Sequence, residues 1–134
     1  MIPNPHCLKI LIVDPSKEST ESLSQFLKVK GIKVVSTNDA MEGLLNIRQE
    51  NFDFVLMNID MPVISGLGII EFLAGEDTLK NQNIFIFSET NIPEVKIKHL
   101  LRKDGIKGIL KKSKNHDDLL NSISSVITQK PFEY

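Results

Sequence analysis

Short apolar runs alternate with longer segments of helical period along this chain, and turn residues stand at the junctions. A short, continuous apolar run is typical of a strand buried on both faces, and such strands alternate with helices when the sheet is parallel. The pattern therefore predicts an α/β fold in which five strands and five helices form a doubly wound parallel sheet. The expected strands are Leu8–Val13, Ile32–Ser36, Asp53–Asn58, Asn83–Ser88 and Lys107–Leu110, and the expected helices lie near Ser16–Lys30, Asp39–Asn51, Leu67–Ala74, Pro93–Lys103 and Asn115–Thr128.

Two of the expected helices have recognisable ends. Gly31 is a suitable stop for the first helix, because glycine adopts the left-handed conformation at a helix C-terminus at little cost. Asp39 is a suitable N-cap for the second helix, since its side chain can accept a hydrogen bond from an otherwise unpaired backbone N–H. The apolar residues of this second helix are expected to face mostly inward, and they are Met41, Leu44, Leu45 and Ile47.

A chain of 134 residues that is 41% hydrophobic and 25% charged is long enough for one globular domain. We expect a single domain over residues 1–134, with a core of 8–128 and loose ends. The net charge of −1 gives no overall attraction to nucleic acid or to an anionic membrane. The single cysteine, Cys7, fits a reducing compartment. No signal-peptide pattern begins the chain and no apolar run approaches the roughly 20 residues of a membrane span, so we predict a cytoplasmic protein.

Polar residues follow four of the five expected strands, where ligands bind in doubly wound sheets. Asp14 follows the first strand, Asn58 ends the third and Asp60 comes two residues later. Ser88 ends the fourth strand and Lys112 follows the fifth. Because the carboxyl ends of parallel strands meet at one edge of the sheet, we expect these five side chains to line one small crevice.

Each of these residues also has a simpler interpretation. Asp14 before Pro15 resembles a helix N-cap followed by proline at the first helical position. Asn58 and Ser65 could be only turn and cap residues, and for Ser65 this is the interpretation that we favour. Ser88 alone could satisfy only a loop backbone, and Lys112 alone could be a solvated lysine. The histidines share no metal-ligand spacing and are expected at the surface: His6, His99 and His116.

Four stretches resemble, in order and spacing, the receiver domains of two-component response regulators: "ILIVD", "DFVLMNIDMPVISG", "IFIFS" and "GIKGILKKS". The resemblance covers residues 8–128 and implies a flavodoxin-like receiver fold with strand order 2-1-3-4-5 and helices on both faces. It also implies a site at which an aspartate in the position of Asn58 accepts a phosphoryl group from a histidine kinase. Two acids after the first strand hold Mg²⁺ in that family. A Ser or Thr after the fourth strand and a lysine followed by a proline after the fifth complete its site.

Carried across residue by residue, the resemblance is partial. Asp14 matches the first acid, whereas Pro15 stands in the place of the second and has no side-chain ligand for a metal. Asn58 stands in the place of the phosphoacceptor. Ser88 and Lys112 match the hydroxyl and the lysine. The remaining departures are Ile109, where a Tyr or Phe is usual, and Ser113 in place of the proline.

Two of these departures, at Asn58 and Pro15, decide the function that we predict. Phosphoryl transfer to a receiver needs an anionic oxygen nucleophile and a divalent cation. The amide of Asn58 carries no charge and forms no stable acyl phosphate, and Pro15 removes one of the carboxylates on which Mg²⁺ depends. We therefore predict a degenerate receiver that is not an enzyme, needs no cofactor, is not phosphorylated and acts through protein–protein interaction.

Asp60 leaves an alternative open. In an extended segment its side chain would lie on the same side as that of Asn58, where Asp14 and Asp60 together could bind Mg²⁺ weakly. A responsive receiver would then use Asp60 as the acceptor, although a shift of two residues moves the nucleophile by about 6–7 Å. A responsive receiver would also result if Asn58 were an engineered replacement of a natural aspartate. Pro15 makes this less plausible, because one point change would not also remove a metal-binding acid. A third hypothesis is an unrelated flavodoxin-like binder of small molecules or enzyme.

Positive charge is concentrated in one part of the chain. Residues 96–114 contain eight basic residues and one acid, a net of +7, which leaves −8 for the rest because the whole chain carries −1. Such a surface attracts an acidic protein and speeds its encounter. The resemblance places it on the fourth helix, fifth strand and fifth helix, the face that receivers use for partners, although a charge run can also be only a solvated face. The expected partner face comprises Lys96, Lys98, Arg102, Lys103, Lys107 and Lys111.

Overall fold

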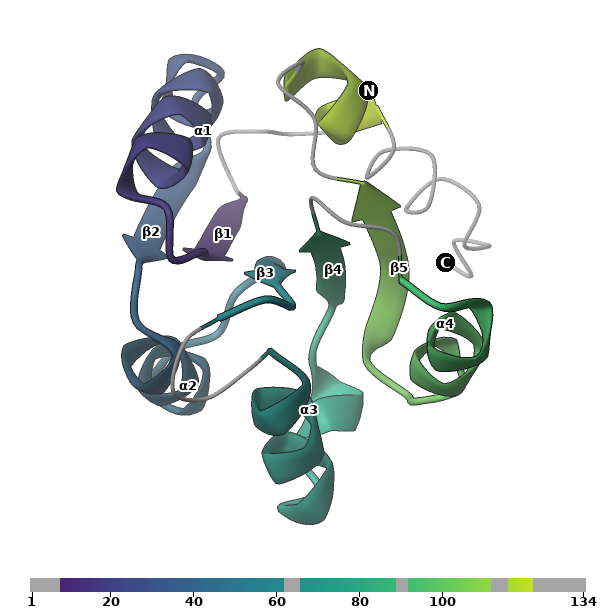
Figure 1. The fold of residues 1–134 in the computed structure, drawn as a ribbon. Helices are drawn as coiled ribbons and strands as arrows, with labels where there is room; N and C mark the ends of the chain where they lie inside the picture. The colour runs from purple at the N-terminus through teal and green to yellow at the C-terminus, as the bar shows by residue number, and fades with distance from the viewer. Residues whose placement is uncertain (1–7, 62–65, 89–91, 112–115, 122–134) are drawn as a thin grey trace, which may run out of the picture.

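The computed structural model describes residues 8–61, 66–88, 92–111 and 116–121 (Figure 1). Its strands are β1 (Lys9–Val13), β2 (Lys33–Thr37), β3 (Phe54–Asn58), β4 (Ile84–Ser88) and β5 (Ile106–Lys111). They pair in parallel as one sheet in the order β2-β1-β3-β4-β5, which confirms the expected fold. Each strand begins and ends within one residue of its predicted position.

Helices cover both faces of this sheet. They are α1 (Lys17–Val29), α2 (Ala40–Gln49), α3 (Gly66–Gly75), the short 3-10 helix η2 (Leu79–Asn81) and α4 (Glu94–Leu101), and residues 116–121 are also helical. Figure 1 shows α1 and residues 116–121 on one face and α2, α3 and α4 on the other. None of the helices in the described part of the chain combines the length and apolarity that crossing a bilayer requires.

The hydrophobic core lies in two layers, one on each side of the sheet. Alternate residues of β1 point into different layers, as the pleat requires. Ile10 and Ile12 pack on the side of α1, whereas Leu11 and Val13 pack on the side of α2, α3 and α4. All four are at most 1% exposed. Burial on both faces explains why the strand is apolar at successive positions.

Both predicted helix ends are confirmed. Gly31 has φ of +88° and donates its backbone N–H to the carbonyl of Lys28 at 2.9 Å, which ends α1. Asp39 caps α2, because its carboxylate accepts the backbone N–H of Glu42 at 3.2 Å.

The prediction for the inward face of α2 was half wrong. Leu44 and Ile47 are buried, but Met41 and Leu45 are 45% and 48% exposed. The helix instead packs on β1 through its small residues. A Cβ at Gly43 would lie 2.9 Å from Cγ2 of Val13, so this close approach needs glycine. That packing turns the larger side chains of Met41 and Leu45 toward solvent.

Candidate functional site

Three of the predicted site residues are buried at the carboxyl ends of neighbouring strands. Asp14, Asn58 and Ser88 follow or end β1, β3 and β4 and are 1%, 5% and 1% exposed. Asp60 lies two residues beyond β3 and is exposed. Lys112 lies outside the described residues, so its predicted place in the crevice stays a prediction.

Asp14 belongs to the sheet and not to the helix that follows it. Its backbone N–H donates to the carbonyl of Thr37 at 3.1 Å, which continues the pairing of β1 with β2. The N-cap of α1 is Ser16, whose hydroxyl accepts the N–H of Ser19 at 3.1 Å. The interpretation of Asp14 as the N-cap was therefore wrong. Its carboxylate instead accepts the N–H of Ser16 at 3.0 Å, with one oxygen, Oδ1.

Asn58 connects Asp14 with Asp60. Its Nδ2 donates to Oδ1 of Asp14 at 3.3 Å, and its Oδ1 accepts the backbone N–H of Asp60 at 2.8 Å. Ser88 then donates its hydroxyl to Oδ2 of Asp60 at 2.9 Å. The side chain of Asp60 thus lies at the same edge as Asn58, and Ser88 bonds a side chain and not only a loop backbone. These four residues form one chain of hydrogen bonds across three strand ends, which we call the strand-end network.

Asn38, which follows β2, was missed in the sequence although its position is of the same kind. Its Nδ2 donates to the backbone carbonyl of Asp14 at 2.8 Å and to Oγ1 of Thr20 at 3.1 Å. It therefore ties the end of β1 to α1 and fixes the backbone that carries the Asp14 carboxylate. A polar residue directly after the second strand was the signal that could have identified it.

The strand-end network offers few ligands to a metal ion. No group of three or more His, Cys, Asp or Glu side chains that could hold a metal occurs in the described ranges. The available carboxylates are those of Asp14 and Asp60, and Oδ1 of Asp14 and Oδ2 of Asp60 already accept hydrogen bonds. Mg²⁺ requires near-octahedral oxygen ligation, normally with carboxylates free to bind it. The described donors are thus a poor fit to a Mg²⁺ site.

The predicted basic face is divided among several elements. Lys96, Lys98 and Arg102 lie in or just after α4 and are exposed, and Lys98 forms an ion pair with Glu94 at 3.4 Å. Lys103 instead lines a shallow cleft between the end of α4 and η2, where it is partly buried. Lys107 on β5 is also partly buried, and the side chain of Lys111 lies outside those described. Among the described side chains of the predicted basic face, the exposed ones therefore lie on the outer side of α4 or just after it.

The histidines occupy different environments. His99 on α4 is exposed, as predicted, and His6 lies outside the described residues. His116 is only partly exposed, so its surface prediction was incomplete. Its Nε2 lies 2.9 Å from the hydroxyl of Ser22, and its ring centroid lies 5.3 Å from that of Phe26. His116 thus fastens the start of the last described helix to α1.

The fold agrees with comparisons with known proteins. A family model described as response regulator receiver domain matches residues 10–124, so the chain belongs to that family. It is therefore a receiver-type domain of two-component signalling. Receiver domains are signalling modules that interact with other signalling proteins.

Individual relatives support the same class. The CAI-1 autoinducer sensor kinase/phosphatase CqsS of Vibrio cholerae is 31% identical over 121 residues, which are 90% of this chain and 17% of that protein. The two-component response regulator-like protein APRR3 of Arabidopsis thaliana is 30% identical over 60% of this chain and 17% of its own length. The chain thus spans about a sixth of the length of these two relatives. The chemotaxis response regulator CheY4 of Vibrio cholerae has a solved structure with 26% identity and a TM-score of 0.77, covering 89% of this chain and 98% of that one.

Proposed function

We propose that this chain is a receiver-type signalling module that is not phosphorylated and acts by binding another protein. The observation that carries the proposal is the strand-end network, in which Asn58, the residue that the resemblance puts at the phosphoacceptor position, is bonded on both sides. Its Nδ2 donates to Asp14 and its Oδ1 accepts from the backbone of Asp60. The side chain that would have to attack is therefore a neutral amide whose oxygen already accepts a hydrogen bond.

The chemistry of the network supports this proposal. A carboxylamide oxygen is a weak nucleophile, and phosphoryl transfer also requires charge stabilisation at the transferred group. Ser88, whose matching residue in the family bonds the phosphoryl oxygens, donates its hydroxyl to Asp60 instead. An incoming phosphoryl group would have to displace that bond. Within the network, both ends of the Asn58 amide and the Ser88 hydroxyl have hydrogen-bond partners, as is usual for buried polar groups.

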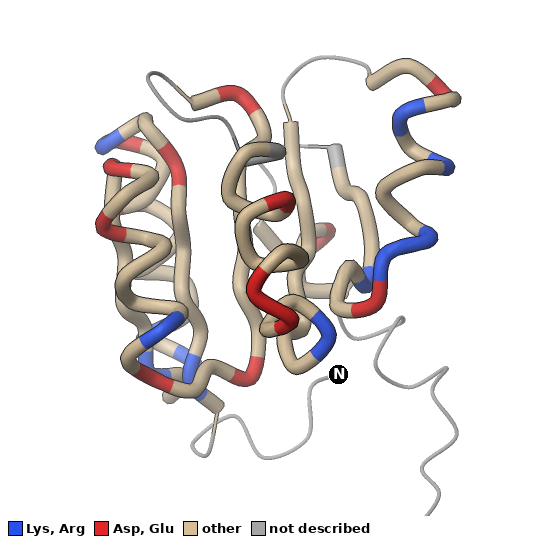
Figure 2. The backbone as a smooth tube through the Cα atoms, turned by 90° about the horizontal axis from the view of Figure 1, so that it is seen from below, with Lys and Arg blue, Asp and Glu red and all other residues tan. Residues whose placement is uncertain are grey.

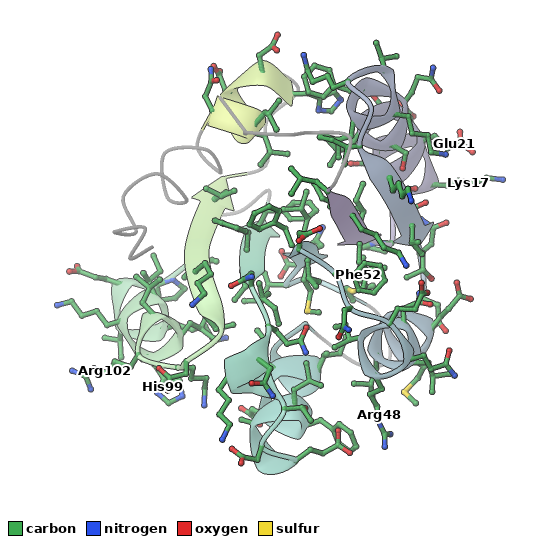
Figure 3. The ribbon with its side chains drawn as sticks, turned by 180° about the vertical axis from the view of Figure 1, so that it is seen from behind. Lys17, Glu21, Arg48, Phe52, His99 and Arg102 are labelled. Carbon is green, nitrogen blue, oxygen red and sulfur yellow. The ribbon has the colours of Figure 1, made fainter. Side chains whose placement is uncertain are left out.

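The partner surface that we propose is the exposed basic side of α4. Lys96, Lys98 and Arg102 project from it into solvent. In Figure 3, Arg102 and His99 point away from the sheet. An excess of positive charge on an exposed helix, here three bases against Glu94, favours encounter with an acidic protein surface. Signalling would then depend on binding and not on a phosphorylation cycle.

A second candidate function is a responsive receiver in which Asp60 is the acceptor. One observation favours it, because the Asp60 carboxylate is exposed and lies 2.9 Å from the Ser88 hydroxyl. Asp60 would then supply the anionic oxygen that Asn58 lacks. Such a receiver would have to bind Mg²⁺ through the carboxylates of Asp14 and Asp60, which already accept hydrogen bonds from Asn58 and Ser88 respectively.

The deciding experiment is incubation with acetyl phosphate and Mg²⁺ followed by intact-protein mass spectrometry. We expect no adduct of one phosphoryl mass. An adduct that is abolished by Asp60→Asn and unaffected by Asn58→Ala would overturn the proposal in favour of the second candidate. The CheY4 protein of Vibrio cholerae, described as a chemotaxis response regulator, is a suitable comparison protein for the phosphorylation conditions.

A further inference from the structure

The seam between α2 and α3 exposes apolar surface. Met41 and Leu45 on α2 and Phe72 on α3 are each nearly half exposed, at 45%, 48% and 46%. Arg48 closes one end of this seam, because its guanidinium lies 5.9 Å from the Phe72 ring centroid and 3.3 Å from the carboxylate of Glu76. We call Met41, Leu45 and Phe72 the α2–α3 seam.

Negative charge borders this seam. Glu42 on α2 and Glu71 on α3 are exposed, and each neighbours a seam residue in sequence. Residues 39–77, which include both helices, contain eight acids and the single base Arg48, a net of −7. A partner for the seam must therefore offer both apolar and basic side chains.

The exposed side of α4 has this chemistry. Val95 is 82% and Leu101 is 48% exposed, whereas Leu100 is fully buried. Helical spacing places Val95, Lys98 and Arg102 in one row on the side away from Leu100. Residues 94–102 contain three bases and the single acid Glu94, a net of +2, opposite in sign to the charge of residues 39–77. The exposed side of α4 thus combines apolar and basic side chains, whereas the α2–α3 seam combines apolar side chains with acidic neighbours.

The two surfaces lie in the same layer of the molecule. Figure 2 views this layer from outside the sheet, with acidic residues marked on α2 and α3 and basic residues along α4. In Figure 3, Arg48 on α2 and His99 on α4 point away from the sheet on this same side. Two copies placed face to face about a two-fold axis would therefore bring each α4 onto the α2–α3 seam of the other copy.

We propose that two copies of this chain associate in this way, with α4 of each seated on the α2–α3 seam of the other. Val95 and Leu101 cover Met41, Leu45 and Phe72, while Lys98 and Arg102 approach Glu42 and Glu71. The two-fold arrangement makes this contact twice and closes the assembly as a dimer. The inference rests on the proposed binding role of α4 and names its acidic partner as a second copy.

The contact is weak and depends on salt. Its apolar part consists of a few side chains on each side, typical of transient interfaces and not of obligate ones. Its charges stay near solvent, where salt screens them within about 8 Å at physiological ionic strength. We expect the dissociation constant to rise about tenfold when the salt concentration rises from about 0.05 M to about 0.5 M.

Charge reversal on each surface tests the pairing. The seam variant is Glu42→Lys/Glu71→Lys, and the α4 variant is Lys98→Glu/Arg102→Glu. The matched control is Glu18→Lys/Glu21→Lys, which makes the same charge change as the seam variant at exposed positions of α1, on the other face of the sheet. Circular dichroism and thermal unfolding establish that all three variants are folded.

Sedimentation velocity over a range of concentrations at low salt then measures association. We expect dimers of the wild-type protein and of the α1 control, and monomers of the seam and α4 variants when each is alone. An equimolar mixture of the seam and α4 variants should associate again, because each surface then meets one of opposite charge. A wild-type protein that stays monomeric at about 1 mM, well above most transient affinities, overturns the dimer. So does a mixture that fails to associate, or a control that is as impaired as the seam variant. None of these results bears on the phosphoryl-adduct experiment, which tests the proposed function separately.

Discussion

At the strand ends, Asp14, Asn58 and Ser88 are buried and linked by hydrogen bonds, whereas on the outer side of α4, Val95, Lys98 and Arg102 lie in solvent. In the first region, polar groups form hydrogen bonds with one another. In the second region, the basic and apolar side chains are accessible to a binding partner. In a receiver fold, the strand ends are the place of chemistry and the helix surfaces are the place of recognition. The departures from the family pattern that we read in the sequence, Pro15 and Asn58, fall in or next to the first region, and for this reason we propose that the chain acts by recognition.

The largest effect is expected from removing the carboxylate of Asp14. The Asp14→Ala variant leaves the buried Asn58 amide and the partly buried Ser16 N–H without their acceptor. Loss of buried hydrogen bonds to a charged group costs about 2–3 kcal/mol. Urea unfolding measures this loss, and Asp14→Asn, which keeps an acceptor oxygen, should lose less. Equal stability of Asp14→Ala and the wild type would contradict a structural role for the network.

Introducing a carboxylate at position 58 should also cost stability. In Asn58→Asp, the donor that bonds Asp14 at 3.3 Å becomes a second negative charge. Two carboxylates this close raise the pKa of the introduced carboxyl in the folded state. The variant should therefore match the wild type best below about pH 4 and lose about 1–2 kcal/mol as the pH rises to neutrality.

Magnesium provides the control for this variant. A divalent cation between the two carboxylates should offset part of the loss at neutral pH, and the wild type should show little response. Thermal unfolding with and without Mg²⁺ measures both effects. A wild-type protein that is stabilised by micromolar Mg²⁺ would instead favour the second candidate function, with Asp14 and Asp60 as ligands.

Removing the Ser88 hydroxyl tests the outer part of the network. Ser88→Ala breaks the bond to Oδ2 of Asp60, but the carboxylate of Asp60 is exposed and can bond water instead. We expect a loss of about 1 kcal/mol, the usual net value of one hydrogen bond. Urea unfolding again provides the measurement, and a loss as large as that of Asp14→Ala would show that Ser88 holds more than this bond.

The smallest effect on stability is expected on the helix surface. Lys98→Glu/Arg102→Glu changes exposed side chains of α4, so the free energy of unfolding of the monomer should stay within about 0.5 kcal/mol per substitution. Chemical denaturation at a low protein concentration, where self-association is negligible, provides the test. A larger loss would mean that these side chains stabilise the protomer, and the contrast between the two regions would be weakened.

The sequence predicted the positions of the residues in the strand-end network better than their hydrogen-bond partners. Strand ends are set by local apolar runs, so the positions of Asp14, Asn58 and Ser88 followed directly from the pattern. Their partners did not, because Asn58 and Asp14 are 44 residues apart and Ser88 and Asp60 are 28 apart. Asp14 was given two roles by its sequence, as site residue and as N-cap. The second role is excluded because Ser16 is the N-cap of α1.

What the sequence determined by itself was the order of strands and helices, the caps at Gly31 and Asp39, and the separation of acidic from basic charge. The order of elements depends on the pattern of neighbouring residues, the caps depend on the preferences of single residues, and the charge separation follows from counting charged residues along the chain. Only the tertiary structure decided which side of α2 faces the sheet. Gly43 allows α2 to approach Val13 so closely that Met41 and Leu45 turn outward. The α2–α3 seam on which the proposed dimer depends exists for that reason. Which residues of a helix pack inward depends on the shape of the surface that the helix meets, and not on hydrophobicity alone.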